Sequence, residues 1–509
     1  MRSAATPLLR QLRRAFALSL PAEALEGRTS RREFLTKTAA ATLAVSSLGL
    51  AGCASNAAAS KKRKIEVGIL GAGIAGLHAA YVLKKAGIQA QVFDSSERTG
   101  GRMFSKDNLL AEGLVTELGG EFIDSNHEDM LALAKEFKLP LLDMKSDAKV
   151  DEYDFYFRDN HYTVTDFVKA LKPYSKAILA DIEALPDTIT YQNPGSAKTW
   201  DKMSITQYLK SKGLKGWIFE LLDVAFTTEY GLDSSEQSAV NFLFLFDPAL
   251  PVDEFELFGE SDERFKIEGG NQRLVDELAK RIPDIRLSWE VEKISTAGPG
   301  VRVLFRSGDD IYFDYLICTI PFSRLRHVTL DIADLPAVKR RAINELGYGT
   351  NAKFLLGFTK RLWRELGFSG QVFADNGIQL AWDNSRLQPG KAGGLTVYTG
   401  GTNSASMIKN PKPVQAEIYL KKLNKIYPSL QQFYNGNHGL FYWPDHPHTL
   451  GSYACYKVGQ WSAFAGAEIE PVGALHFAGE HCSADFQGYM NGGAETGRRA
   501  AESVLKAMK

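Results

Sequence analysis

The 509-residue chain has few cysteines, no excess of charge of either sign and no long apolar run. Four cysteines without a Cys-x-x-Cys pair argue against a disulfide-stapled scaffold and against a cysteine-based metal site. Sixty Lys and Arg residues balance sixty Asp and Glu residues, so no overall basic field favours nucleic acid as a partner. The length and the hydrophobic fraction of 44% allow two or three ordinary globular units.

The nine histidines are scattered along the chain. Their closest cluster is Asp445-His446-Pro447-His448, which lies beside prolines and has no third ligand nearby in the sequence. A polar loop explains this cluster best, and we predict no metal site.

The first fifty residues are typical of an export signal. Arg31-Arg32 followed by Phe34-Leu35 is similar to the twin-arginine motif, and the apolar segment that follows is too short and too rich in Ala and Ser to span a bilayer. We predict a signal over residues 1–52 and a flexible linker over residues 53–64. The protein is then exported to the periplasm or to another site outside the cytoplasm.

The signal ends in Leu50-Ala51-Gly52-Cys53. This run resembles the site at which bacterial lipoproteins are cleaved and lipidated on the cysteine. We predict a lipid anchor at Cys53, and the alternative is a cleaved signal with an incidental cysteine.

Residues 65–94 have the pattern of a dinucleotide-binding half-site. Alternating β-branched residues at 65–70 predict a strand, and a predicted helix ends at Gly87. The next strand ends on Asp94, about twenty residues beyond a Gly-x-Gly-x-x-Gly turn, where a ribose-binding carboxylate is expected. The glycines of this turn, which permit close approach of backbone to a pyrophosphate, are Gly71, Gly73 and Gly76.

A second small-residue loop occurs near the other end of the chain. The run "GEHCSADFQGYMNGGAETGRRAA" at residues 479–501 predicts a loop that enters a helix. The free N–H groups of such a helix start are suited to an anion or to an electron-rich ring edge.

Three further runs give these loops a common explanation. They are "DSSERTGGRMFS" from Asp94, "ELGGEFID" from Glu117, and Phe477-Ala478-Gly479-Glu480 before Gly488-Tyr489. Together they resemble the FAD-dependent amine oxidase family, which includes monoamine and L-amino-acid oxidases, and they look most like bacterial L-amino-acid oxidases. The resemblance covers nearly all of residues 65–506 and is weakest at about 145–260 and 360–440.

The resemblance implies an α/β fold in which both chain ends hold one FAD. A Rossmann-like FAD-binding domain, discontinuous in sequence, is expected at residues 65–145, 262–320 and 450–509. An inserted α+β substrate-binding domain is expected at residues 146–261 and 321–449, with a helical pattern over 166–246. The runs at 285–294 and 314–325 are expected to be strands.

The resemblance also implies the residues that contact the cofactor. Besides the front glycines and Asp94, these are Arg98, Gly101, Arg102, Gly119, Gly120, Glu121, Val291, Glu480 and Met490. In relatives that attach FAD covalently, a Cys precedes a cage tyrosine, and here Ser452 occupies that place. We therefore predict non-covalent FAD, with Cys455 on the same face as Tyr453 if the segment is a strand.

Four side chains are implied in the substrate site. Lys353 matches a lysine that holds a water near the flavin, Tyr489 and Tyr453 match the walls of an aromatic cage, and Trp382 is a candidate pocket residue. The alternatives are an exposed strand lysine and ordinary core aromatic residues. We find no convincing nucleophile, and hydride transfer to a flavin needs none.

The expected reaction is oxidation of an L-amino acid to the 2-oxo acid, ammonia and hydrogen peroxide, with O2 as acceptor. Family members that act on amino acids often have an Arg where this chain has Phe122, so a carboxylate clamp is missing or comes from elsewhere. Glu229 and Asp233 could bind a cationic substrate tail, although a solvated loop explains them as well. The alternatives are an amine or polyamine oxidase and a flavin-binding protein without turnover. The oligomeric state and cysteine pairing are not readable from the sequence.

Overall fold

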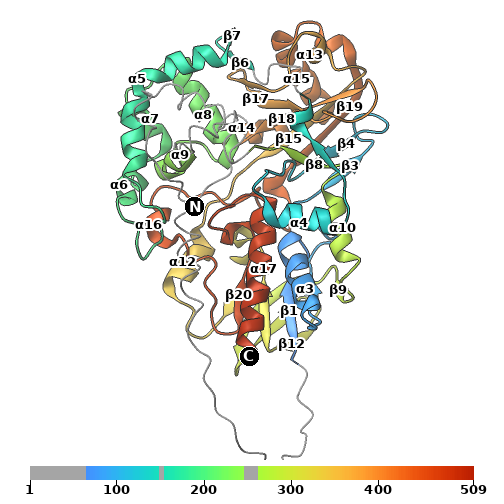
Figure 1. Cartoon of the computed structure of the whole chain (residues 1–509), viewed down its shortest axis with the longest axis vertical. Coiled ribbons are helices and arrows are strands. Elements are labelled where there is room, and N and C mark those ends of the chain that lie inside the picture. The colour runs from blue at the N-terminus through green and yellow to red at the C-terminus, as the bar shows by residue number, and fades with distance from the viewer. Residues whose placement is uncertain (1–64, 148–153, 246–261) are drawn as a thin grey trace, which may run out of the picture.

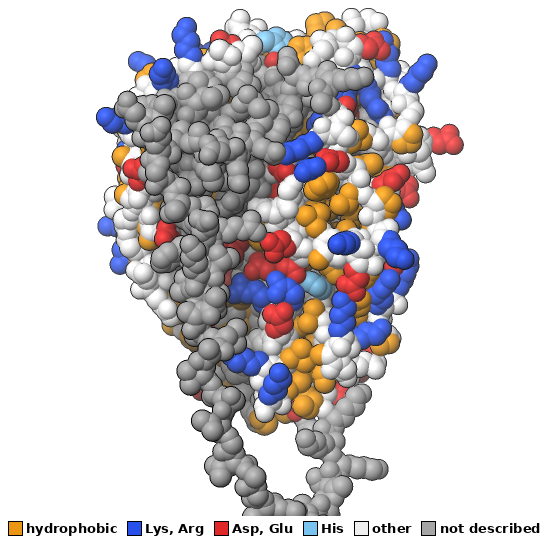
Figure 2. Space-filling model, viewed as in Figure 1, with side chains coloured by type: hydrophobic (Ala, Val, Ile, Leu, Met, Phe, Trp, Pro, Cys, Tyr) orange, Lys and Arg blue, Asp and Glu red, His pale blue; other side chains and the backbone are white. Residues whose placement is uncertain are grey.

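The computed structural model describes residues 65–147, 154–245 and 262–509, so the predicted signal, the linker and Cys53 lie outside the described residues. A parallel sheet and its helices form the lower half of the molecule in Figure 1, and a helical group and an antiparallel sheet form the upper half. Acidic and basic side chains are interspersed on the face shown in Figure 2, as the balanced composition predicts. No helix within the described ranges has the length and hydropathy of a membrane span.

The parallel sheet has five strands in the order β20-β13-β1-β2-β9. Strand β1 (Val67–Leu70) lies at its centre, and all four of its residues are buried, as is typical of a parallel strand covered on both faces. The other strands are β2 (Gln91–Phe93), β9 (Ile285–Arg286), β13 (Tyr315–Cys318) and β20 (Leu475–Phe477). This sheet therefore draws strands from the front, the middle and the end of the described chain.

The first and last of the large helices pack against each other on this sheet. Helix α3 (Ile74–Lys85) and helix α17 (Met490–Ala507) lie side by side, blue beside red in Figure 1. Small residues permit the close approach, because a Cβ at Gly497 would collide with the backbone carbonyl of Ala75. A Cβ at Gly493 would meet the Ile74 side chain at 2.8 Å.

A four-stranded sheet lies next in the fold, in the order β12-β11-β10-β14. Its strands are β10 (Val291–Ala297), β11 (Gly300–Phe305), β12 (Asp310–Phe313) and β14 (Thr329–Asp331). The second segment of the predicted FAD-binding domain ends at residue 320. Strand β14 lies beyond that residue, yet it pairs with β10. This sheet therefore crosses the predicted boundary, and the division into domains stays a prediction.

The seven-stranded sheet has the order β19-β15-β18-β17-β16-β6-β7, and only its β16–β6 pair is parallel. Register places Lys353 on β15 directly opposite Tyr398 on β18, and Leu380 on β17 opposite Tyr398 in turn. Trp382, two residues beyond Leu380, shares that face of the sheet. The strands are β6 (Asp154–Phe157), β7 (Asn160–Tyr162), β15 (Ala352–Phe358), β16 (Val372–Ala374), β17 (Gln379–Asp383), β18 (Gly393–Thr399) and β19 (Tyr434–Tyr442).

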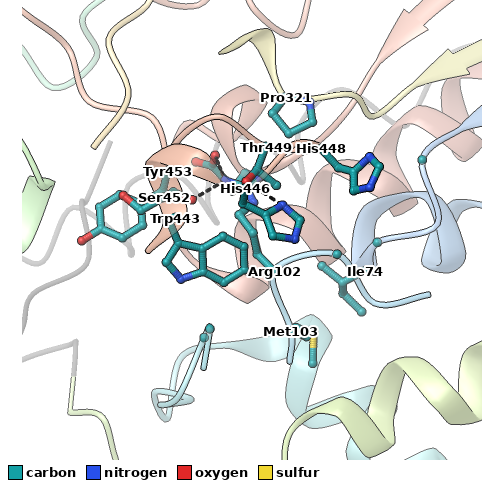
Figure 3. Close-up of a pocket in the computed structure, with 18 of the residues that line it drawn as sticks. Ile74, Arg102, Met103, Pro321, Trp443, His446, His448, Thr449, Ser452 and Tyr453 are labelled. Atoms are coloured by element: carbon teal, nitrogen blue, oxygen red, sulfur yellow. Dashed lines mark hydrogen bonds and ion pairs between the residues drawn. The ribbon is translucent and has the colours of Figure 1, made fainter. Parts of the chain in front are cut away.

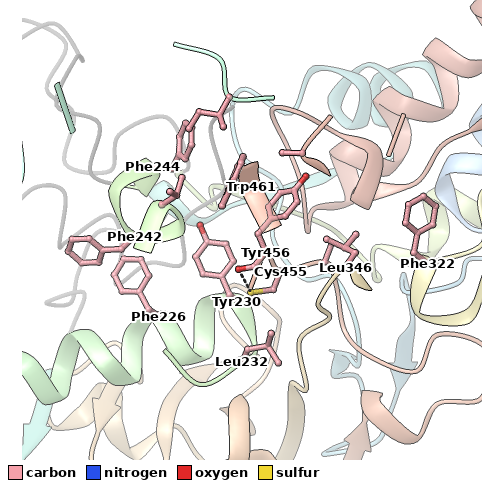
Figure 4. Packing of buried hydrophobic residues seen from close by; sticks show 14 of the residues in the cluster. Phe226, Tyr230, Leu232, Phe242, Phe244, Phe322, Leu346, Cys455, Tyr456 and Trp461 are labelled. Atoms are coloured by element: carbon pink, nitrogen blue, oxygen red, sulfur yellow. Dashed lines mark hydrogen bonds between the residues drawn. The ribbon is translucent and has the colours of Figure 1, made fainter. Parts of the chain in front are cut away.

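The segment expected to be helical forms five helices, which agrees with its sequence pattern. They are α5 (Val164–Glu183), α6 (Ala197–Asp201), α7 (Ile205–Ser211), α8 (Trp217–Tyr230) and α9 (Ala239–Leu245). Aromatic side chains join them to the C-terminal part of the chain, because the ring centroids of Phe244 on α9 and Trp461 on α16 (Gln460–Phe464) lie 5.1 Å apart (Figure 4).

Two expected strands are shorter than their sequence patterns suggest. The run 285–294 divides into β9 and β10 because Ser288 has a φ of +61°, which interrupts an extended chain. The run 314–325 is a strand only as far as Cys318. Pro321 then precedes helix α11 (Phe322–Leu325), because proline has no N–H for a strand ladder and suits a helix start.

The remaining elements connect these layers. The strands are β3 (Ser105–Asp107), β4 (Val115–Glu117), β5 (Leu141–Asp143) and β8 (Phe265–Ile267). The helices are α4 (Glu128–Glu136), α10 (Gln272–Ala279), α12 (Ala337–Glu345), α13 (Leu362–Glu365), α14 (Gly401–Ser404), α15 (Lys412–Ile426) and α16 (Gln460–Phe464). Short turns of tighter helix are η2 (Met144–Ser146), η4 (Ala405–Ile408), η5 (Leu430–Phe433), η6 (Trp443–Asp445) and η7 (Glu480–Cys482).

The substitution Gly497→Ala tests the close packing of α3 and α17. Alanine favours a helix interior over glycine by about 1 kcal/mol, so any net loss must come from the collision with the Ala75 carbonyl. We expect a net loss of about 1–3 kcal/mol in the free energy of unfolding, measured in urea with FAD present. Gly493→Ala is the matched control. Its loss of unfolding free energy should be smaller, because the Ile74 side chain that it meets can move aside. A Gly497→Ala protein as stable as the parent would contradict this packing.

Candidate active site

A cavity of about 320 Å³ lies where the two end helices, the parallel sheet and the seven-stranded sheet meet. Its wall includes Gly73 from the front of the described chain and Gly488 from near its end. Leu70 and Thr319, at the carboxyl ends of β1 and β13, also line it. This is the edge of an open parallel sheet at which ligands bind.

The front glycine turn forms the base of the cavity. Gly71 has a φ of +108°, and a Cβ at Gly76 would collide with the Gly71 carbonyl, so both positions require glycine. Gly73 precedes helix α3 without a side-chain cap, so the first N–H groups of that helix have no side-chain partner at the cap. A Cβ at Gly73 would come no closer than 3.9 Å to Gly101, which leaves the backbone open to a ligand.

Asp94 directly follows strand β2 and lines the cavity, close to where the sequence predicted a ribose-binding carboxylate. One carboxylate oxygen accepts the N–H of Ala72 at 2.6 Å, and the other accepts the N–H of Ser96 at 2.8 Å. Burial raises the pKa of this carboxyl above its ordinary value. Asp94 therefore also fixes the glycine turn, and its contact with a ribose stays a prediction.

Arg98 braces the turn that carries the second glycine pair. Its guanidinium donates to the Gly101 carbonyl at 2.5 Å and lies 4.0 Å from the Phe104 ring centroid. Arg98, Gly101 and Arg102 all line the cavity. The donors of Arg98 are thus used partly to hold the shape of its own loop.

Glu480 joins three segments of the cavity wall. Its carboxylate accepts from Arg102 at 2.6 Å, from the Gly488 N–H at 2.8 Å and from the Ala454 N–H at 3.3 Å. Arg102 also donates to the Ser452 carbonyl at 2.9 Å. One buried carboxylate therefore links residues from both ends of the described chain.

The glycine pair at 119–120 is packed too closely for any side chain. A Cβ at Gly119 would collide with the Arg102 carbonyl, and a Cβ at Gly120 would lie 2.7 Å from Cγ of Met490. Both glycines and Met490 line the cavity, as does Val291 at the start of β10. The structure thus places these residues on the cavity wall, and their contacts with FAD remain a prediction.

Lys353 is buried in the cavity wall, which excludes the exposed-lysine alternative. Only 4% of the residue is exposed. Its ammonium donates to the carbonyls of Glu117 and Gly119 at 3.0 and 2.9 Å, and to Glu121 at 2.9 Å. Its predicted role in holding a water is not tested by these contacts, which use three N–H groups within the chain.

Glu121 lies between two lysines. One carboxylate oxygen of Glu121 accepts from Lys353, and the other accepts from Lys266, each at 2.9 Å. Burial alone would raise the pKa of Glu121, but the charges of Lys266 and Lys353 hold it at about 2. Burial raises the pKa of nearby Glu117 to about 7, despite the opposing charge of Lys266.

A chain of hydroxyl groups runs along the aromatic wall. The Tyr453 hydroxyl donates to the Glu229 carbonyl at 2.6 Å, and the Tyr398 hydroxyl lies 2.9 Å from that of Tyr453. Because a carbonyl oxygen only accepts, the Tyr453 proton points to Glu229, and Tyr398 is then the donor to Tyr453. Both hydroxyls therefore present lone pairs to any further partner. Burial raises the pKa of both tyrosines, so they stay neutral.

Tyr489 and Trp382 complete this wall. The Tyr489 ring centroid lies 5.1 Å from that of His127, and the Trp382 centroid lies 5.3 Å from that of Tyr398. Both residues line the cavity. The indole N–H of Trp382, whose residue is 9% exposed, has no hydrogen-bond partner in the described part of the chain.

Several lining residues were not predicted. Figure 3 shows Trp443 and His446 near Tyr453, and His448 also lines the cavity. Burial lowers the pKa of His446 to about 4, so this imidazole is neutral, and the described residues contain no group of three potential metal ligands. Tyr398 and Lys266 were also missed. Only the pairing of β15 with β18 reveals Tyr398, because it faces Lys353 across 45 residues of sequence.

The expectation that Cys455 shares the face of Tyr453 is wrong. Residues 451–459 form no strand, so alternation does not apply. The Cys455 thiol is fully buried among hydrophobic residues, 3.7 Å from the Asn241 amide (Figure 4). Ser452, in the place of the attaching cysteine, donates to the Asn351 side chain at 2.6 Å.

The cavity fits a long ligand with a phosphate group and a polar ring. Helices α3 and α17 both begin at it without a side-chain cap, so their first N–H groups are available for anionic or electron-rich atoms. Between them, glycine backbone replaces side chains at Gly73, Gly101 and Gly120. These features are the ones that FAD requires.

Comparison with known proteins agrees with this geometry. A family model described as flavin containing amine oxidoreductase matches residues 74–505. A flavin-containing amine oxidase of Oncorhynchus mykiss is 23% identical over 87% of this chain and 86% of its own length. A putative L-amino-acid oxidase of Bacillus subtilis is 24% identical over 86% and 94%. Cyclohexylamine oxidase from Brevibacterium oxydans has a TM-score of 0.77 at 20% identity, over 87% and 99%, which confirms the predicted α/β fold.

Removal of the Glu480 carboxylate is expected to loosen the cavity. Glu480→Ala leaves Arg102 without its carboxylate and two N–H groups without their acceptor. We expect a loss of about 2–5 kcal/mol in the free energy of unfolding and a lower FAD content per chain. The control is Glu502→Ala, which breaks a pair with Arg498 that is largely exposed and should change stability by less than about 0.5 kcal/mol. Equal effects of the two substitutions would contradict this role.

Glu117 should make stability fall as pH rises. In the folded protein its carboxyl keeps its proton up to about pH 7, against an ordinary pKa of 4.5. The folded state therefore binds more protons than the unfolded state between these values, and the free energy of unfolding decreases with rising pH. Glu117→Gln should remove a decrease on the order of 3 kcal/mol, measured by urea unfolding at several pH values. An unchanged pH dependence would show that Glu117 does not titrate in this way.

Proposed function

The chain belongs to the flavin-containing amine oxidoreductase family and binds FAD, and from this premise we propose that it oxidises an amine that carries a second positive charge. A basic L-amino acid is the first candidate substrate. Its products are the 2-oxo acid, ammonia and hydrogen peroxide, with O2 as the acceptor. The observation that supports the proposal is one cavity in which the glycine turns meet Tyr453, Tyr489 and Lys353.

The chain's residues have separate tasks in this scheme. When bound, FAD supplies the chemistry by accepting a hydride from the carbon that bears the amine. The first turn of α3 binds the pyrophosphate, and the first turn of α17 stabilises negative charge on the ring, since a helix N-terminus carries partial positive charge.

Tyr453 and Tyr489 orient the amine and exclude water. The Tyr453 proton is already donated to the Glu229 carbonyl, so this hydroxyl cannot donate to the amine. The lone pairs of Tyr398 and Tyr453 instead suit an N–H donor. Such a wall favours an amine over a negatively charged group.

The proposal of a second positive charge is supported by acidic residues near this wall. Glu229 and Glu263 line the cavity. Their charges, with that of Glu121, add to the effect of burial in raising the pKa of Tyr398, so they act on the same region. Asp233, the other acid considered from the sequence, instead accepts the backbone N–H of Thr402 at 3.0 Å and is not retained as a substrate contact.

The Trp382 indole N–H is a candidate donor for the substrate carboxylate, because Trp382 lines the cavity and this N–H has no partner among the described residues. Phe122 also lines the cavity, at the place where family members that act on amino acids often have an arginine. A neutral donor holds a carboxylate more weakly than arginine does. This favours the second candidate, a diamine or polyamine without a carboxylate, more than the motifs alone do.

The site of action is proposed from the sequence only. The twin-arginine run and Cys53 lead us to propose an exported protein with a lipid anchor, and both lie outside the described residues. We likewise propose that FAD is held without a covalent bond.

Two matched pairs of amines separate the candidates. L-arginine and agmatine share a guanidinium and differ in the carboxylate; L-tyrosine and tyramine differ in the same way and lack the second positive charge. We expect L-arginine to bleach the bound flavin under nitrogen at least about tenfold faster than the two aromatic amines, since one lost contact of 1.4 kcal/mol is tenfold. Air should restore the colour and release peroxide.

The same panel can overturn the proposal. Bleaching by agmatine but not by L-arginine would support an amine or polyamine oxidase. Equal rates with tyramine and agmatine would exclude a role for the second charge. A yellow protein that no amine bleaches would be a flavin-binding protein without oxidase turnover.

A further inference from the structure

A buried group of charged residues supports the cavity wall from behind. Lys353 on β15, Lys266 on β8 and Glu121 are each at most 6% exposed. Glu121 binds one ammonium with each carboxylate oxygen, both at 2.9 Å. Lys266 was not expected from the sequence, and the proposed reaction does not by itself require it.

The contacts of Lys353 fix its position. An ammonium has three N–H donors, and three acceptors surround this one: two carbonyls and Glu121. The place of Lys353 in the wall is therefore set by these three acceptors, of which Glu121 is the only side chain. The ammonium of Lys353 lies 5.2 Å from the centroid of the Trp382 ring.

Lys266 in turn fixes Glu121. It also donates to the Asn384 carbonyl at 3.4 Å and lies 5.7 Å from the centroid of the Phe122 ring, so its own position is determined by three contacts. A buried carboxylate with a single ammonium partner is less strongly held in its ionised form than one with two. Two ammonium groups on one carboxylate also leave an excess of one positive charge in this group of three.

We propose that Lys266 is a positioning residue of the reaction: through Glu121, it keeps the ammonium of Lys353 in one place at the cavity wall. Lys266 contacts Glu121, and Glu121 contacts Lys353. Positive charge fixed in this way stabilises negative charge that develops in the cavity during oxidation. The effect of Lys266 on catalysis rests on the proposed function. The contacts that link Lys266, Glu121 and Lys353 do not depend on it.

A pH titration of the holoprotein tests this link. The titratable groups that face Glu121 are Glu117 on β4, Lys266 on β8, Lys353 on β15 and Tyr398 on β18. Because Glu117 itself titrates near neutrality, the parent for the experiment is Glu117→Gln. Lys266→Met and Lys266→Arg are compared in that background from about pH 5 to about pH 9. The visible spectrum of the bound flavin and its rate of bleaching by L-arginine under nitrogen are recorded.

Lys266→Met should create a new titration on the acid side. Without Lys266, Glu121 takes up a proton at higher pH, and Lys353 loses its anionic partner as pH falls. The flavin spectrum should then change with pH, and the bleaching rate should fall about tenfold for each pH unit below the new pKa. Lys266→Arg keeps the positive charge and should restore the behaviour of the parent. Lys457→Met, which breaks an exposed pair with Glu236 at 3.1 Å, is the control and should titrate as the parent does.

The outcomes separate this inference from the proposed function. A Lys266→Met protein with the spectrum and rate profile of its parent would overturn the inference, whatever its melting temperature. If no amine bleaches the flavin in any variant, the proposed function fails, while the spectral titration still tests Lys266. If Lys266→Met does not fold, Glu121→Gln replaces it: it removes the anion that links Lys266 to Lys353, so the flavin spectrum should differ from that of the parent, and an unchanged spectrum would overturn the inference.

Discussion

The contact between the first and last helices determines the rest of this structure. Gly497 and Gly493 allow α17 to approach α3 at backbone distance, and the starts of both helices then meet at one cavity. Without that contact, the uncapped N–H groups of the two helices would not face a common ligand. The parallel sheet also needs the last part of the chain to return to the first, because its edge strand β20 comes shortly before α17. Cofactor binding and sheet closure therefore depend on the same packing.

Buried carboxylates then hold the cavity in shape. Glu480 and Glu121 each accept hydrogen bonds from groups on several chain segments, and the charges of two lysines keep Glu121 ionised by lowering its pKa. Such groups are stable only in complete networks, since the loss of one partner leaves a buried charge without compensation. The same cavity also has a wall of tyrosines, where the hydroxyl of Tyr453 donates to the Glu229 carbonyl and accepts from Tyr398.

Short motifs predicted residues that the structure brings to one cavity, whereas some of their neighbours have no local signal. The glycine turn, Asp94, Arg102 and Glu480 follow from short patterns, because backbone conformation imposes glycine and charge at fixed spacing. Tyr398 and Lys266 have no local signal, since strand register brings them to Lys353 and Glu121 from distant segments. The strand expected over 314–325 was too long because Pro321 ends it. Cys455 was misplaced because an assumed strand is an irregular segment whose thiol packs against the helical group.

The position of β20 and α17 at the end of the sequence also has a consequence for biosynthesis. A ribosome makes the front glycine turn some four hundred residues before the helix that completes its binding site. The cavity is therefore incomplete until α17 has been synthesised and has packed against α3. A shorter nascent chain has only the front glycine turn for the dinucleotide, so FAD held by both helix starts cannot template the folding of the segments made before α17.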